Sequence, residues 1–388
     1  MGGIRGTHPE FLNFRIRGAS LEFPLSPNSS QHSRGHMKTR RCFVIAVLML
    51  LFQSGFAARE NLPAQITDEE FWKLSSESSE PDGTFRSDNL LSNESYFQFV
   101  IPKLKETTVE ERVYMGVGPE QNFTYIAALK PRMAFIIDIR RGNLDLQLMY
   151  KALFELSTDR ADFVSLLFSR KRPEGLELES SVQEIFAAFG KTFSSEALYT
   201  ENLKRIQDHL TKTHSFPLSA NDLEGIEYVY HNFYRFGPNI NYGSSGRGGF
   251  GGVSYEELMT ATDAQGVFRS YLASEENFAV LKTLETKNML VPVVGNFAGS
   301  KAIRAVGKYV RDNDGKIAAF YLSNVEQYLQ QDGIWDDFCR NVATLPLDES
   351  STFIRSVRGG RFGFGAGLNS DLSSMSSEAS HCAPEKQK

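Results

Sequence analysis

The stretch Val113-Tyr114-Met115-Gly116-Val117-Gly118-Pro119 decides the fold class of this chain. A short apolar run ends there in two glycines, and a helical pattern follows over 120–129. The apolar run 133–137 then closes on Asp138, 22 residues after the first of the two glycines. Strand, glycine turn, helix and strand in this order are typical of a βαβ unit, and such units build parallel sheets.

The same alternation continues along the chain after one long interruption. The pattern predicts a helix over 144–156, strands over 289–294, 316–322 and 352–357, and helices over 301–311 and from 325 onward. Between them, 159–287 favours amphipathic helices and holds a glycine-rich loop at 242–252. We therefore expect a doubly wound, mostly parallel Rossmann-like α/β domain over 111–358, with a large, mainly helical insertion at about 159–287.

Two flanking regions are predicted to differ from this domain. The segment 62–110 is expected to be helical, because the stretch 65–75 favours a short helix with Thr67 and Glu70 at capping-box spacing, and 90–105 favours a second helix. The Ser-rich segment 369–388 is expected to be a disordered tail, because its composition offers little apolar surface to bury.

The N-terminal residues carry the pattern of a secretory signal. Basic residues at 38–41, an apolar run at 42–52 and small residues up to Ala58 predict a signal peptide over 37–58. Because such signals stand at the start of a chain, we expect synthesis to begin near Met37 and 1–36 to be an over-extended, disordered start. The protein is thus expected to be exported, either periplasmic or secreted. Membrane anchoring by an uncleaved signal is the alternative, and no other membrane span is expected.

Composition and motifs exclude several classes of protein. The formal net charge of −5 gives no indication of nucleic-acid binding. Outside the signal segment the cysteines are Cys339 and Cys382, which allow one bridge at most. No cysteine and histidine cluster has zinc spacing, so no metal site is predicted. The order of residues also fits no Walker loop, serine-protease triad or His-Glu-x-x-His motif.

The glycine turn and Asp138 are the residues most suited to binding a small molecule. Glycine lets the backbone approach a ligand closely, and the start of the following helix offers free N–H groups. An acidic side chain at the carboxyl end of the next strand can accept both hydroxyls of a ribose. This combination predicts a pocket for an adenosine-containing cofactor.

In these features the chain resembles the class I S-adenosylmethionine-dependent methyltransferases, whose first motif is a glycine-rich turn after strand 1. The resemblance implies an S-adenosylmethionine site in which Asp138 holds the ribose. Asn296, after the strand 289–294, then takes the place of the residue that contacts adenine. The other implied cofactor-binding residues belong to the turn itself: Gly116, Val117, Gly118 and Glu120.

The resemblance also implies a substrate side of the site at the end of the strand 316–322, formed by Ser323, Asn324 and Glu326. His231 is a further candidate catalytic residue, because the pKa of histidine suits a general base. An uncharacterised group of bacterial methyltransferase-like proteins is similar in three strings, 116–123, 138–141 and 321–326. The substrate is not indicated by either resemblance.

Two alternatives stay open. Met115 and Asn296 stand where the methyltransferases carry acids, and an exported protein has no obvious supply of S-adenosylmethionine. A non-catalytic binding or scaffold protein on the same fold is therefore the second hypothesis. A dinucleotide-binding oxidoreductase is the third, although Gln121 occupies the position of its third glycine. Strand order helps to decide, because the methyltransferase sheet carries an antiparallel last strand.

Overall fold

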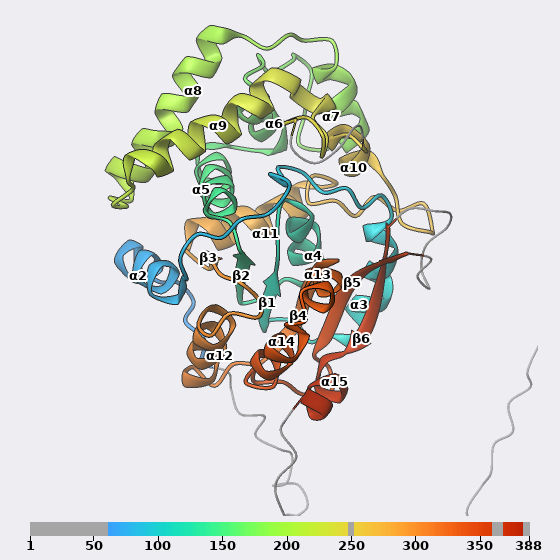
Figure 1. The fold of residues 1–388 in the computed structure, drawn as a ribbon. Coiled ribbons are helices and arrows are strands. Elements are labelled where there is room, and N and C mark those ends of the chain that lie inside the picture. Colours follow the sequence, from blue (N-terminus) through green and yellow to red (C-terminus); the bar gives the residue numbers. More distant parts are fainter. Residues whose placement is uncertain (1–60, 247–251, 359–367, 383–388) are drawn as a thin grey trace, which may run out of the picture. The chain divides into compact units, whose positions relative to one another are not determined.

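The computed structural model describes residues 61–246, 252–358 and 368–382. The expected signal peptide at 37–58 and the segment 1–36 lie outside these residues. A six-stranded sheet forms the centre of the described chain, in the order β3-β2-β1-β4-β5-β6. Figure 1 labels its strands, which are β1 Val113–Gly116, β2 Met133–Asp138, β3 Leu290–Val294, β4 Ile317–Ser323, β5 Thr352–Arg358 and β6 Leu368–Ser374.

The sheet is parallel except at one edge. β3, β2, β1, β4 and β5 pair in parallel, and β6 pairs antiparallel to β5 over seven residue pairs from Thr352 and Ser374 to Arg358 and Leu368. Strands β1, β2 and β3 are buried along their whole length, which explains their continuous apolar sequences. The expected Rossmann-like α/β fold with a mostly parallel sheet is confirmed.

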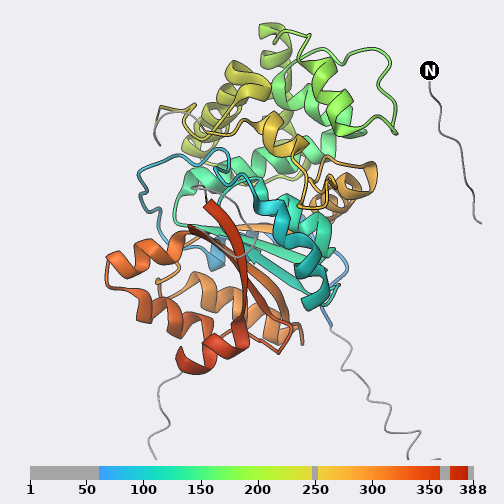
Figure 2. The same cartoon turned by 90° about the vertical axis from the view of Figure 1, so that its right-hand side faces the viewer.

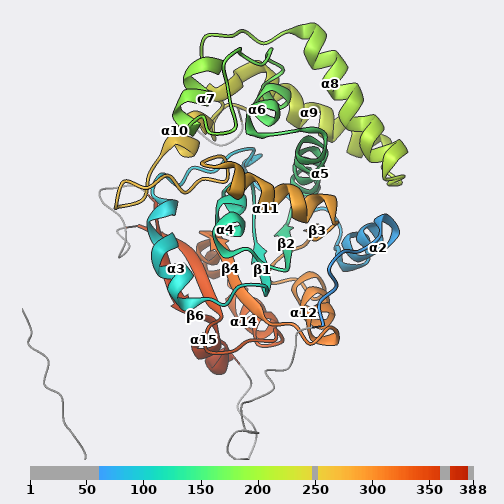
Figure 3. The same cartoon turned by 180° about the vertical axis from the view of Figure 1, so that it is seen from behind.

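Helices cover both faces of the sheet, as the opposed views of Figures 1 and 3 show. One face carries α3 Ile101–Thr107, α4 Gln121–Leu129 and α11 Glu275–Thr286. The other carries α12 Ala302–Asp312, α13 Val325–Gln331 and α14 Trp335–Val342. The bounds of α4 and α12 and the start of α13 lie within a residue of the expected helices, because each of the three follows a strand and repeats its apolar residues with helical periodicity. Helix α14 was not expected.

The long interruption between β2 and β3 is helical, as expected. After α5 Arg141–Leu156 it contains α6 Arg160–Phe168, α7 Val182–Phe189, α8 Glu196–Asp208, α9 Ala220–Phe236 and α10 Tyr255–Thr260, with the short helix η3 Gly237–Asn239. A π-helical segment, η2 His209–Thr213, continues α8. Figure 2 shows these helices gathered at one end of the sheet, and α9 packs along α5.

The segment before β1 wraps around the carboxyl ends of the strands. Helix α2 Asp68–Ser78 begins at the predicted capping box of Thr67 and Glu70. The carboxylate of Glu80 then accepts the backbone N–H groups of Asn296, Lys301 and Ala302, so an acid from this segment satisfies the start of α12. The helix expected over 90–105 is wrong in its first part, because only η1 Phe97–Val100 and α3 form there.

The segment expected to be a disordered tail is ordered through Cys382. It forms β6 and then α15 Met375–Cys382, and Cys382 is joined to Cys339 of α14 by a disulfide. The prediction was wrong because amino-acid composition gives no information on pairing with another strand. β5 supplies the backbone hydrogen-bond partners of β6, so Asn369 and Ser370 are buried despite their polarity. None of the helices in the described ranges is long and apolar enough to cross a bilayer.

Candidate functional site

A cavity of about 690 Å³ opens at the carboxyl ends of β1, β2, β3 and β4. It lies at the reversal of strand order between β1 and β4, which is where open α/β sheets bind ligands. The strand ends contribute Val117, Gly118, Asp138, Gly295, Asn296, Ser323 and Asn324 to its wall. Residues that lie far apart in the sequence, such as Val117 and Asn324, therefore line one open cavity.

The two glycines of the turn have different roles. A Cβ on Gly116 would lie 1.9 Å from the Asn122 side-chain oxygen, so this glycine makes room for Asn122 beneath the turn. Gly118 lines the cavity at a φ of +78°, and a Cβ there would meet nothing within 4 Å although the residue is buried. Gly118 is thus the glycine that keeps the cavity wall open, whereas Gly116 serves packing.

The glycine turn is held from behind by two amide side chains. The Nδ2 group of Asn122 donates to the carbonyls of Val117 at 2.9 Å and Pro119 at 2.7 Å. The Nε2 group of Gln147 donates to the carbonyl of Gly118 at 3.0 Å. Asn122 and Gln147 are both buried, so the turn is fixed in place before any ligand arrives.

Asp138 reaches the cavity wall from the end of β2, but its carboxylate already has a partner. Arg140 pairs with both oxygens, with Nε 3.1 Å from Oδ1 and Nη2 3.2 Å from Oδ2, and its backbone N–H donates to Oδ1 at 2.9 Å. Arg140 also lines the cavity. A ligand hydroxyl would therefore use the remaining lone pairs of a carboxylate whose orientation is fixed.

Asn296 stands at the end of β3, next to the cavity. Its side-chain oxygen accepts the N–H of Ala298 at 2.9 Å, which leaves the amide NH2 group as the donor it can present. Gly295 precedes it because a Cβ at that position would lie 2.2 Å from the Cβ of Ala302 on α12. The tight packing of α12 against this turn thus sets the position of Asn296.

The end of β4 is tied to Glu94 of the N-terminal segment. Oε1 of Glu94 accepts from the hydroxyls of Tyr321 at 2.7 Å and Ser323 at 2.8 Å, and Oε2 accepts from Gln121 at 2.9 Å. Ser323 has a φ of +49°, and the pairing of β4 with β5 shifts register beside it. Glu94 and Ser323 line the cavity, so a carboxylate lies where the strand departs from regular geometry.

Glu120 lies behind the cavity wall rather than in it. Its carboxyl group is buried and accepts the backbone N–H of Ser92. Burial raises the pKa of Glu120 to about 8, an effect that the hydrogen bond from Ser92 only partly offsets. Glu120 therefore belongs to the support of the turn, not to the residues that a ligand touches.

Two of the candidate catalytic residues stand apart from the cavity. His231 is exposed on α9 and packs against the rings of Tyr199 and Tyr234. Glu326 is paired with Arg355, whose Nη2 lies 2.9 Å from Glu326 Oε1. Of the four candidates, the structure brings Ser323 and Asn324 to the cavity, and the other two lie elsewhere in the described chain.

Sequence reasoning missed the part of the wall that precedes β1. Residues 84–94 supply Phe85, Arg86 and Glu94 among others, and Arg86 donates to the hydroxyl of Tyr328, which also lines the cavity. The break in the apolar pattern after the buried Leu90 and Leu91 was an available signal, because the polar run 92–95 follows them. Tyr242, at the start of the glycine-rich loop, also lines the cavity.

A protein-family model described as a domain of unknown function (DUF7790) matches residues 90–220 and 253–384, more than half of the chain. The two matched ranges contain the glycine turn, Asp138, Asn296 and Ser323. No curated protein matches the chain.

Proposed function

The chain belongs to the DUF7790 family, a domain of unknown function, and from this premise we propose that its cavity binds S-adenosylmethionine for methyl transfer. One observation carries the proposal: Gly118, Asp138 and Asn296, from the ends of three adjacent strands, line the same cavity. Its volume, about 690 Å³, lies within the usual range for sites of cofactor-sized ligands.

Each of these residues has a role in the proposed complex. Asp138 accepts the ribose hydroxyls through the lone pairs that Arg140 leaves available, and Asn296 donates its amide to a ring nitrogen of adenine. Gly118 lets the cofactor approach the backbone. Ser323 and Asn324 would form the substrate side and would hold a nucleophile in line with the methyl group, whose bond to sulfur breaks as its bond to the nucleophile forms, with S-adenosylhomocysteine as the leaving group.

The topology of the sheet also supports the proposal. A methyltransferase sheet carries an antiparallel last strand, and β6 pairs antiparallel to β5 at the edge of this one. A dinucleotide-binding oxidoreductase is less well supported, because Gln121 is buried against Ser92 and Glu94 where that fingerprint needs a third glycine.

Isothermal titration of the purified chain with S-adenosylhomocysteine tests the proposal. We expect one saturable site per chain, and we expect NAD and NADP to give no heat under the same conditions. Absence of binding by S-adenosylhomocysteine, from protein that is folded by circular dichroism, would end the methyltransferase proposal. Binding of NAD alone would favour the oxidoreductase.

A binding protein without transferase activity is the second candidate, and Arg140 favours it. Arg140 occupies both oxygens of Asp138, which leaves fewer acceptor sites for a ribose, and the guanidinium group of Arg86 on the cavity wall can bind a phosphate group. The Cys339–Cys382 disulfide also supports export, because such bonds persist in oxidising compartments, and export separates the cavity from the cytosolic cofactor pool. Thermal stabilisation by ADP but not by S-adenosylhomocysteine would select this candidate.

A further inference from the structure

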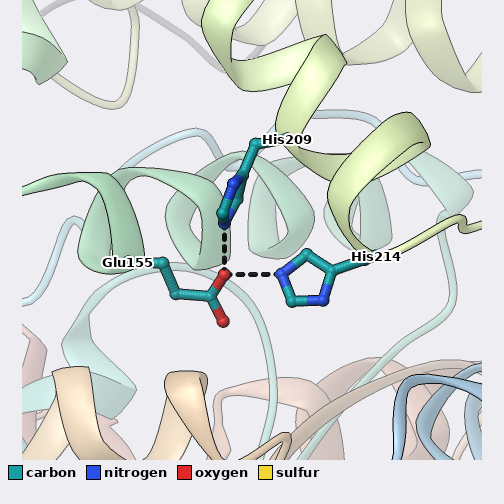
Figure 4. A group of neighbouring side chains, drawn as sticks. All are labelled: Glu155, His209 and His214. Atoms are coloured by element: carbon teal, nitrogen blue, oxygen red, sulfur yellow. Dashed lines mark hydrogen bonds and ion pairs between the residues drawn. The ribbon is translucent and has the colours of Figure 1, made fainter.

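A second group of ligating side chains lies outside the cavity, where α5 meets the π-helical segment η2. Oε2 of Glu155 lies 2.5 Å from Nε2 of His209 and 2.6 Å from Nε2 of His214. Figure 4 shows both imidazole rings directed at this one carboxylate oxygen. The three side chains are 7–17% exposed, so they are enclosed but still reachable from solvent.

The π-helical turn is what brings the two histidines together. The N–H of His214 donates to the carbonyl of His209 at 3.1 Å, a bond between residues five apart. In an α-helix, residues five apart point about 140° away from one another, so regular geometry would separate these rings. Such wide turns are uncommon and occur frequently at functional sites. This turn places both Nε2 atoms on one side, facing α5.

Neighbouring groups fix the orientation of two of the three side chains. Nδ1 of His214 lies 2.7 Å from Oδ1 of Asp68, which also accepts from Asn288 at 2.8 Å. The second oxygen of Glu155, Oε1, accepts from the Lys151 ammonium group at 2.7 Å. Thus Nε2 of His214 and Oε2 of Glu155 are the atoms that remain directed at the shared point. A carboxylate behind a ligating histidine is the usual outer partner of a metal site.

We propose that Glu155, His209 and His214 bind a divalent first-row transition-metal ion, with Zn²⁺ as the ion that fits them best. Two imidazoles and one carboxylate form the three-ligand set of many zinc sites that keep one position open. Around a tetrahedral ion the ligand atoms are about 3.3 Å apart, so the carboxylate and the rings separate by under ~1 Å on binding. His209 is the most exposed of the three side chains, at 17%, so it is the one that solvent, and with it a water ligand, reaches.

The competing account is an ion-pair network without metal. In it, the carboxylates of Glu155 and Asp68 balance Lys151 and a protonated His214, and the group serves only to join α2, α5 and η2. Both accounts use the same contacts, and they differ in one measurable property. A network held by protons has no specific affinity for Zn²⁺, whereas a metal site binds one ion and loses it when a ligand is replaced.

The test is titration of the full chain, stripped with a chelator, with Zn²⁺ alone. We expect one Zn²⁺ per chain, a rise in melting temperature that chelator reverses, and visible absorption bands of a four-coordinate ion when Co²⁺ replaces Zn²⁺. His209→Gln should weaken Zn²⁺ binding at least 100-fold, and Asp68→Asn, which alters only the outer partner, about 10- to 100-fold. Glu155→Gln should abolish the Co²⁺ bands.

His231→Gln is the matched control, because it removes an exposed histidine outside the group and should leave Zn²⁺ binding unchanged. Circular dichroism establishes that each variant is folded, and the Asp68→Asn result keeps the test decisive if a ligand variant unfolds. Two results would overturn the proposal: no saturable Zn²⁺ binding by the wild-type chain, or equal binding by wild type and the folded His209→Gln variant. Neither outcome depends on what the cavity binds.

Discussion

Arg140 folds back onto Asp138, two residues before it, and holds both oxygens of its carboxylate at 3.1 and 3.2 Å. The two side chains are only 11% and 5% exposed, so the pair forms a nearly buried part of the cavity wall. The Asp138 carboxylate, which the proposed function uses to bind the ribose hydroxyls, is thus oriented by the guanidinium group of Arg140 before a ligand binds. This pair is the first place to test the proposal.

Asp138→Asn should weaken S-adenosylhomocysteine binding about 10- to 100-fold, because a hydrogen bond to a charged acceptor contributes about 1.5–3 kcal/mol. Isothermal titration measures the change. Asp222→Asn is the matched control, since Asp222 forms a similar pair with Arg141 at 2.8 Å outside the cavity. Equal losses in the two variants would mean that Asp138 acts through stability and not through the ligand.

Gly118→Ala should reduce both the free energy of ligand binding and the free energy of unfolding, and the loss in binding should be the larger of the two. Gly118 and Gly266 have the same φ of +78°, and a Cβ on either meets nothing within 4 Å. Alanine at either position should therefore cost a similar backbone strain of about 1–2 kcal/mol in the free energy of unfolding. Only Gly118 lines the cavity. If Gly266→Ala reduced binding as much as Gly118→Ala, the turn would have no direct contact with the ligand.

Glu120→Gln should flatten the dependence of stability on pH. The pKa of Glu120 is about 8 in the fold against an ordinary value of 4.5. Its contribution to stability is complete below pH 4.5 and is lost as pH rises toward 8, because there the unfolded chain ionises and the folded chain does not. Glutamine resembles the protonated acid. The free energy of unfolding of the variant, relative to wild type, should therefore rise between pH 4.5 and pH 8, by a few kcal/mol at most.

Urea unfolding of both proteins at pH 5 and pH 8 measures that difference. Burial raises the pKa of Asp145 and Glu285 to about 8 as well, so part of the wild-type slope should remain in the variant. The exposed Glu174→Gln serves as control and should leave the slope unchanged. A Glu120→Gln variant with the full wild-type slope would show that Glu120 is ionised in the folded protein.

Reduction of the Cys339–Cys382 bridge should loosen helix α15 and should leave ligand affinity in the cavity unchanged. The bridge closes 43 residues of sequence, and loss of such a cross-link typically costs roughly 2–4 kcal/mol of unfolding free energy. Cys339→Ser should therefore speed backbone hydrogen exchange in α15, while ligand affinity stays that of the wild type. Unchanged exchange in α15 would mean that the buried Met375 and the Arg355–Glu378 pair hold the helix by themselves.

The central fold was predictable because each element carries its own local signal. Buried parallel strands have continuous apolar runs, and the helices between them repeat apolar residues with helical spacing, so β1 to β5 fall within a residue or two of expectation. The last strand was not predictable by that route. β6 is Ser-rich and owes its order to pairing with β5, a contact that local sequence does not encode.

The residues of the candidate site also differ in whether the local sequence predicts them. Gly118, Asp138, Asn296 and Ser323 were found because each follows an apolar run, and the ends of parallel strands meet at one edge. Arg86 and Glu94 follow no such run, and they reach the cavity only through the path of an irregular segment. The Glu155, His209 and His214 group was missed because Glu155 lies 54 and 59 residues before the two histidines, and the histidines share one side only through a π-helical turn.

Glu80 and Glu94 show that the strands and their connecting turns do not form the whole cavity region by themselves. A segment that precedes the first strand satisfies the start of α12 and supplies one side of the enclosure. A shortened recombinant protein beginning at residue 90, where the family match starts, would lack Glu80 and Arg86. Expression trials should thus retain everything from Asn61 onward, even though the recognisable domain begins later.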